Sequence, residues 1–247
     1  FGLISGATSY FELLQEPGRR REMVLEDSLW TPPDEGYYAT DAYTEYAVDR
    51  IREHARDSPG RPFFLYLAYT APHFPLHALP EDIARYRGRY DIGWDSLRSE
   101  RYARMREMDI ATERHALAPR PTTVPLWEDA PGQEEWARRM EVYAAMVDRM
   151  DQGIGRILRT LREQGMEENT LVLFLSDNGA SAEDLSGRGL HDADVPIGAR
   201  GSYAGYREPW AYASDTPFRL YKSWVHEGGI ATPMIAYWSA GIRSPGR

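Results

Sequence analysis

The chain has 247 residues and no cysteine, and its 38 acidic and 29 basic side chains give a formal net charge of -9. This length can bury a substantial core in one large domain or two small ones. The excess of acidic residues disfavours a nucleic acid as a partner bound by a general basic face. The absence of cysteine excludes disulfides and thiolate metal ligands within these residues. No apolar run reaches the roughly 18 to 20 residues of a membrane span.

The first half of the chain contains a predicted helix followed by a predicted strand. Within residues 40–56, apolar side chains recur at helical spacing, and Thr40 and Asp41 are competent N-caps. After a turn at residues 57–60, residues 62–69 form a short, almost wholly apolar run between turn residues. This run predicts a buried strand.

The second half repeats this order. Apolar residues from Trp136 to Leu161 alternate steps of three and four, which predicts a long amphipathic helix with Gly165 at its C′ position. Residues 170–175 form a second predicted buried strand, and a third apolar run at 230–238 is broken by Pro233, as suits an edge strand or a bulge. This order of helices and strands predicts an α/β layered fold with a mostly parallel sheet. Residues 80–121 and 179–216 are predicted to be long functional loops, with a short helix at 100–106.

Polar residues follow both predicted strands, and in a parallel sheet they share one edge. The second strand is followed by Ser176-Asp177-Asn178-Gly179. Asp177 and Asn178 are adjacent oxygen donors of the kind that hard cations such as calcium or magnesium prefer, and Gly179 permits a tight backbone. The alternative interpretation is an ordinary turn in which these side chains cap the next segment.

Two further residues are candidates for catalysis. His73 lies between Pro72 and Phe74-Pro75 after the first strand, where it could donate a proton to a leaving group or a hydrogen bond to an anion. The alternative is a histidine satisfied by loop backbone groups. Lys222 is the only lysine of the chain and precedes a glycine turn, where a compact cation could meet an anionic ester, although a single lysine is usually an ordinary surface residue.

Five motifs in a fixed order resemble the type I sulfatases, closest to the bacterial-type arylsulfatases of the alkaline phosphatase-like superfamily. They are FGLISGAT at 1–8, APHFPL at 71–76, YRGRYD at 86–91, LFLSDNG at 173–179 and TPFRLYKSWVHEGG at 216–229. The resemblance spans nearly all of the chain and implies a three-layer α/β/α fold with a mostly parallel central sheet. Residues 1–247 are then expected to be part of a sulfatase catalytic domain, incomplete at both ends.

The resemblance also implies a chemistry. One calcium ion is held partly by residues matching Asp177 and Asn178, and a formylglycine, made from a cysteine or serine by a formylglycine-generating enzyme, attacks the sulfur of a small sulfate ester. Residues matching His73 and Lys222 contact the sulfate and its ester oxygen. The nucleophile motif, Cys or Ser-x-Pro-x-Arg, precedes the matched region, so the expected function is sulfuric ester hydrolysis by a parent protein and not by this stretch alone.

Two alternatives stay open at this point. The same superfamily hydrolyses phosphate diesters and phosphonates, and an upstream threonine or unconverted serine would favour that chemistry. A relative lacking the nucleophile would be a non-catalytic binding module. The resemblance is compatible with a periplasmic, secreted or cytoplasmic bacterial protein.

Overall fold

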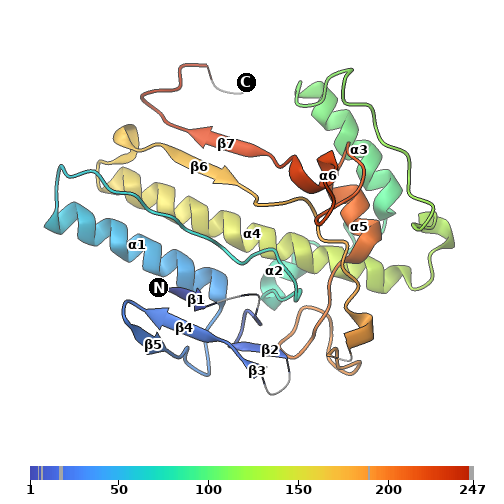
Figure 1. Cartoon of the computed structure of the whole chain (residues 1–247), viewed down its shortest axis with the longest axis horizontal. Coiled ribbons are helices and arrows are strands. Elements are labelled where there is room, and N and C mark those ends of the chain that lie inside the picture. The colour runs from blue at the N-terminus through green and yellow to red at the C-terminus, as the bar shows by residue number, and fades with distance from the viewer. Residues whose placement is uncertain (5, 7, 17–18, 189, 245–247) are drawn as a thin grey trace. The chain divides into compact units, whose positions relative to one another are not determined.

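The computed structural model describes residues 1–4, 6, 8–16, 19–188 and 190–244. Helices and short strands are mixed along the chain (Figure 1), which confirms the predicted α/β class. The chain forms two compact units. The first unit consists of Phe1–His73, Met146–Phe174 and Met234–Arg247, and the second of Phe74–Ala145 and Leu175–Pro233. Among the described residues, no helix is both long and apolar enough to cross a membrane.

The helices and strands have the following bounds. The strands are β1 (Gly2–Ile4), β2 (Leu14–Glu16), β3 (Arg19–Arg20), β4 (Glu22–Leu25), β5 (Ser28–Trp30), β6 (Val172–Leu175) and β7 (Met234–Tyr237). The helices are α1 (Ala39–Asp57), α2 (Pro80–Ala84), α3 (Gly93–Glu107), α4 (Gln133–Glu163), α5 (Arg207–Ser214) and α6 (Glu227–Ile230). Three short 3-10 helices are η1 (Trp127–Asp129), η2 (Glu167–Asn169) and η3 (Ser186–Arg188).

In the first unit, helix α1 packs on the second half of α4. Asp41 of α1 accepts two hydrogen bonds, of 2.8 and 2.6 Å, from the guanidinium of Arg149 on α4. A Cβ on Gly153 of α4 would lie 2.5 Å from Thr44 Oγ1, so glycine permits the close approach of the two helices. The predicted caps are corrected here: α1 begins at Ala39 after Tyr38, and Thr40 and Asp41 lie inside its first turn because Thr40 is buried and Asp41 pairs with Arg149.

The same unit contains a small antiparallel sheet in the order β1-β4-β5, with Leu3 opposite Met23 and Val24 opposite Leu29. Helix α4 ends as predicted, because Gly165 has a φ of +68° and donates its N–H to Arg162 O at 3.0 Å.

The second unit is organised around buried tryptophans. Trp94 of α3 is 0% exposed and packs edge-on against Trp127 and Trp210, with ring centroids 4.7 and 5.6 Å apart. The residues 80–121 and 179–216 are not simply loops, because they contain α2, α3, η3 and α5. The length of α3 was underestimated because its buried positions are few, Gly93, Trp94 and Arg98, and one of them is charged.

The prediction of buried strands is wrong in two places. Residues 62–69 are extended but form no strand among the described residues, and Phe64 and Tyr66 are 91% and 80% exposed. Residues 172–175 do form strand β6, which pairs with β7 (Figure 1), yet Leu173 and Leu175 are 53% and 56% exposed. An apolar run becomes a buried strand only when other elements cover its faces and pair with its edges, and the described residues do not supply that cover.

Candidate functional site

The turn that follows β6 has the tight geometry expected for Ser176-Asp177-Asn178-Gly179. Gly179 donates its N–H to Gly229 O at 3.1 Å, and a Cβ on Gly179 would lie 1.7 Å from Gly228 O. Asn178 donates a hydrogen bond from its side-chain nitrogen to Gly179 O at 2.9 Å. The other side-chain atom, Oδ1, is the one that can bind a cation. Only glycine allows the two chain segments to approach this closely.

Asp177 is an exposed residue of this turn. Its carboxylate forms no hydrogen bond or ion pair with the described part of the chain. The carboxylate of Asp177 and the amide oxygen of Asn178 are the hard oxygen ligands that calcium prefers, so the donor chemistry fits this ion. They can be only part of such a site, because calcium takes about six to eight oxygens, and no group of three or more His, Asp or Glu side chains gathers among the described residues to hold a metal.

Lys222 is joined to this turn through Ala180. Its backbone N–H donates to Ala180 O at 3.0 Å, two residues beyond Asn178. Its side chain is 25% exposed, and Nζ lies 3.6 Å from Glu183 Oε1. Three of the four predicted residues, Asp177, Asn178 and Lys222, therefore lie on two hydrogen-bonded segments of the second unit.

His73, the fourth predicted residue, belongs to the first unit. Its N–H donates to Thr70 O at 2.9 Å, and its own carbonyl accepts the hydroxyl of Tyr10 at 2.9 Å. The neighbouring His77 is a core residue: it is 1% exposed, Nε2 lies 2.8 Å from Ser202 O, and burial lowers its pKa to about 4. An imidazole held neutral in this way has a structural role.

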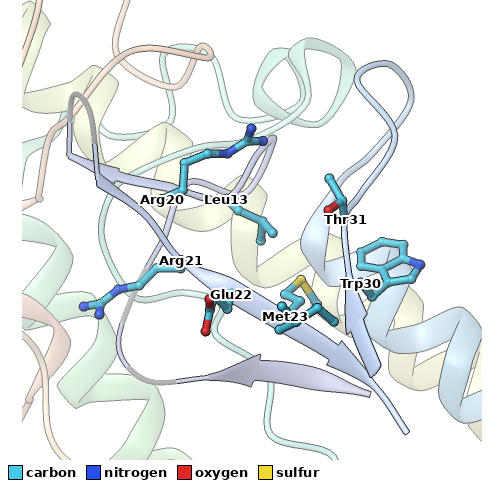
Figure 2. Close-up of a pocket in the computed structure, with 8 residues that line it drawn as sticks. Leu13, Arg20, Arg21, Glu22, Met23, Trp30 and Thr31 are labelled. Atoms are coloured by element: carbon cyan, nitrogen blue, oxygen red, sulfur yellow. The ribbon is translucent and has the colours of Figure 1, made fainter. Parts of the chain in front are cut away.

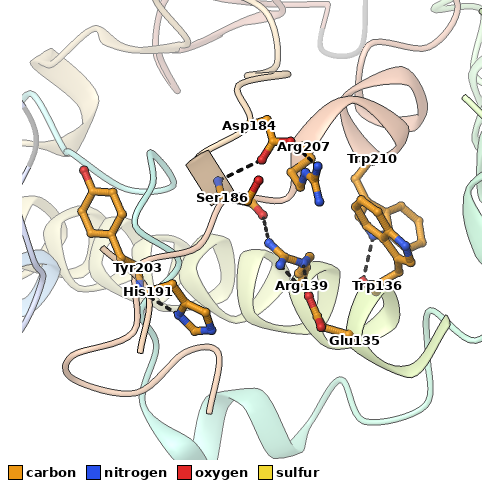
Figure 3. A network of polar contacts seen from close by, with 10 residues as sticks. Glu135, Trp136, Arg139, Asp184, Ser186, His191, Tyr203, Arg207 and Trp210 are labelled. Carbon is orange, nitrogen blue, oxygen red and sulfur yellow. Dashed lines mark hydrogen bonds and ion pairs between the residues drawn. The ribbon is translucent and has the colours of Figure 1, made fainter. Parts of the chain in front are cut away.

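Polar contacts fix the segment that follows the turn (Figure 3). Arg139 of α4 donates to Gly205 O at 2.5 Å, and Arg207 of α5 forms an ion pair with Asp184. Asp184 also accepts the N–H of Ser186 at 2.9 Å. These contacts hold the backbone beside Glu183, the residue that meets the Lys222 ammonium. Glu183 was not identified from the sequence, because it lies in a loop with no motif of its own.

Asp215 is a second residue that sequence reasoning missed. It precedes Thr216-Pro217-Phe218-Arg219, and both of its carboxylate oxygens accept the N–H of Ala180, at 2.9 and 3.1 Å. Burial raises the pKa of this carboxyl to about 7, although the Ala180 N–H and the positive charges of Arg101 and Arg98 lower it. The signal in the sequence that could have identified Asp215 is its position directly before the motif that begins at Thr216.

Asp215 is expected to make the chain less stable as the pH rises. The pKa of its carboxyl is about 7 in the folded chain against an ordinary value of 3.8, so between these values the folded state keeps a proton that the unfolded state has lost. The effect is absent below about pH 4, grows through this window and is complete above about pH 7. Urea unfolding in calcium-free buffer from pH 4 to 8 measures it.

The matched variant is Asp215→Asn, which cannot ionise and still presents an acceptor to Ala180. It is expected to lose this part of the pH dependence. An unchanged pH dependence in the variant would show that another group is responsible.

A cavity of about 200 Å³ lies at the small sheets of the first unit (Figure 2). It is lined by Leu13, Arg20, Arg21, Glu22, Met23, Leu29, Trp30 and Thr31. None of the four predicted site residues is among these side chains.

Comparison with known proteins gives consistent matches. A family model described as Sulfatase matches residues 18–246. The chain is 33% identical over 266 residues to a sulfatase of Schizosaccharomyces pombe described as uncharacterized, which covers 95% of this chain and 46% of that protein. It is 34% identical over 218 residues to an arylsulfatase of Klebsiella aerogenes, which covers 82% of this chain and 45% of that protein.

The chain thus spans about half the length of the curated relatives it matches. Among solved structures, it is similar to Ps i-CgsB in complex with k-i-k-neocarrahexaose, with 25% identity and a TM-score of 0.46. That match covers 85% of this chain and 30% of the other.

Proposed function

Because the chain belongs to the sulfatase family, we propose that it forms part of an arylsulfatase-like catalytic domain that hydrolyses small sulfate esters with calcium and a formylglycine nucleophile. The family has an alkaline phosphatase-like α/β fold, in agreement with the mixture of helices and strands described above. The chain contains no cysteine. In this proposal the formylglycine is made by a formylglycine-generating enzyme from a cysteine or serine outside residues 1–247.

One observation carries the proposal: the Asp177-Asn178 turn at the end of β6 is hydrogen-bonded through Ala180 to the backbone of Lys222. The segment that carries the pair of oxygen donors is thereby hydrogen-bonded to the segment that carries the compact cation. Binding and charge stabilisation of an anionic ester need these groups together, because a cation acts on developing charge only at short range.

The side chains have distinct roles in the proposed reaction. Asp177 and Asn178 would hold the calcium ion, which when bound supplies positive charge that neutralises the sulfate oxygens. Lys222 would stabilise the negative charge that develops on the leaving oxygen, a role for which a compact ammonium is better shaped than the fork of an arginine. His73 would donate a hydrogen bond to the ester oxygen or a proton to the departing alcohol.

The test uses the complete protein that contains residues 1–247, co-expressed with a formylglycine-generating enzyme. Hydrolysis of 4-nitrophenyl sulfate is expected, with loss of activity on chelation by EDTA and recovery on addition of calcium. A bis-aryl phosphate and a phosphonate ester are assayed in parallel. Turnover of these but not of the sulfate would assign the site to phosphoryl chemistry, and no turnover of any of the three by a protein with a verified formylglycine would assign it to a non-catalytic relative.

A further inference from the structure

The peptide unit of Ala180 connects the proposed calcium ligands with Lys222. On one side, its N–H donates to both carboxylate oxygens of Asp215, at 2.9 and 3.1 Å. On the other side, its carbonyl accepts the N–H of Lys222 at 3.0 Å. A displacement of this single peptide would therefore move the end of the Asp177-Asn178 turn and the backbone of Lys222 together.

The amides on either side of Ala180 are also bound to groups distant in sequence. Gly179 donates to Gly229 O at 3.1 Å, and Ser181 donates to the hydroxyl of Tyr206 at 3.2 Å. Tyr206 is 5% exposed and packs against Tyr143 with ring centroids 4.6 Å apart, so its hydroxyl is a fixed acceptor. Three consecutive amides are thus held, and the one in the middle is held by a carboxylate.

A carboxylate at this place needs an explanation, because partial burial makes its charged form costly. Burial raises the pKa of Asp215 to about 7, and the hydrogen bond from Ala180 is the largest effect that opposes this rise. Hydrogen bonds to charged acceptors are roughly twice as strong as those between neutral groups. The bond to Ala180 is therefore the main local gain that offsets the burial of the carboxylate.

We propose that Asp215 is a positioning residue that fixes the Ala180 peptide and thereby holds the Asp177-Asn178 turn and the backbone of Lys222 in one geometry. The functional meaning of this inference rests on the proposed function, since it assumes the roles given to Asp177, Asn178 and Lys222. In this proposal Asp215 binds neither the metal nor the substrate. It acts through the backbone.

The first test measures amide hydrogen exchange by NMR in the full chain, in metal-free buffer. Asp215→Ala is expected to accelerate exchange at Ala180 and at Lys222 by about tenfold or more, the effect of losing a hydrogen bond to a charged group. The backbone N–H of Lys222 is bonded to Ala180 O, so its exchange rate reports the coupling through the Ala180 peptide. Asp215→Asn keeps an acceptor for Ala180 and is expected to restore protection at both amides.

Asp129→Ala is the matched control, because Asp129 is an exposed aspartate of the same unit. It is expected to leave both amides unchanged. Acceleration at Ala180 without any at Lys222, or no acceleration at either, would overturn the proposal. If Asp215→Ala unfolds the chain, Asp215→Asn decides: native protection at Ala180 and Lys222 supports the positioning role, and lost protection refutes it.

A second readout separates this inference from the proposed function. Calorimetric titration of the complete protein with calcium chloride is expected to give a Kd about tenfold weaker for Asp215→Ala than for the unsubstituted protein, with recovery in Asp215→Asn. Failure of the unsubstituted protein to bind calcium would count against the proposed function, while the exchange rates would still decide the role of Asp215. Calcium binding that is unaffected by Asp215→Ala would overturn the link between Asp215 and the metal ligands.

Discussion

Replacing Lys222 by alanine is expected to lower kcat for an aryl sulfate by about 10²- to 10³-fold, the cost of removing one fixed charge or donor that stabilises a developing oxyanion. The ammonium is held on a fixed segment, with its backbone bonded to Ala180 and Nζ 3.6 Å from Glu183. KM is expected to change much less, because the charge on the leaving oxygen develops mainly in the transition state. Steady-state kinetics of the complete, formylglycine-bearing protein measures both constants.

Lys222→Arg separates charge from shape. The variant keeps the positive charge but replaces a compact ammonium by a planar fork, so only a minor part of the lost kcat is expected to return. Arg104→Ala is the control, because Arg104 is an exposed cation of α3 in the same unit. A Lys222→Ala protein that hydrolyses the ester as fast as the Arg104→Ala control would remove Lys222 from the reaction.

The long elements and the turn after β6 were predictable from the sequence because their determinants are local. The spacing of apolar residues predicts α1 and α4 to within a few residues, and Gly165 ends α4 where predicted. Ser176-Asp177-Asn178-Gly179 follows β6 directly, as the apolar run before it indicates. Local spacing and turn chemistry are sufficient for such features.

Burial and long-range partners were not predictable in the same way. Leu173 and Phe64 are apolar, so the sequence predicts that another element covers them. Both side chains are exposed, because the described residues supply no such element. Strands β1 to β5 have only two to four residues, too few to establish a period of two. Asp215 gains its role from an amide 35 residues earlier in the chain, a pairing that no local pattern contains.

The family resemblance added what the spacing could not. It selected Lys222 and His73 as functional, whereas composition alone left an ordinary lysine and an ordinary loop histidine as alternatives. The structure then joins Lys222 to the turn through Ala180. That contact supports the selection of Lys222 by an observation independent of the motif, and His73 remains a prediction.

A buried guanidinium organises the segment that carries Asp215. Arg98 of α3 is 1% exposed and donates to the carbonyl oxygens of Tyr212, Pro217 and Phe218, the last two at 3.0 and 2.9 Å. Its guanidinium also stacks on the Tyr212 ring, 4.2 Å from the ring centroid. Backbone carbonyls on both sides of Asp215 are thus satisfied by one side chain.

Arg98→Met is therefore expected to destabilise the chain by about 3 to 5 kcal/mol, because it leaves several buried carbonyls without a donor while keeping an unbranched apolar stem. Urea unfolding followed by circular dichroism measures the loss. Arg104→Met, an exposed position six residues later on the same helix, is expected to change the free energy of unfolding by no more than about 0.5 kcal/mol. Equal stabilities of the two variants would mean that the carbonyls around Asp215 do not depend on Arg98, and the segment would then have to be held in place by the packing of Trp210 and Tyr212 alone.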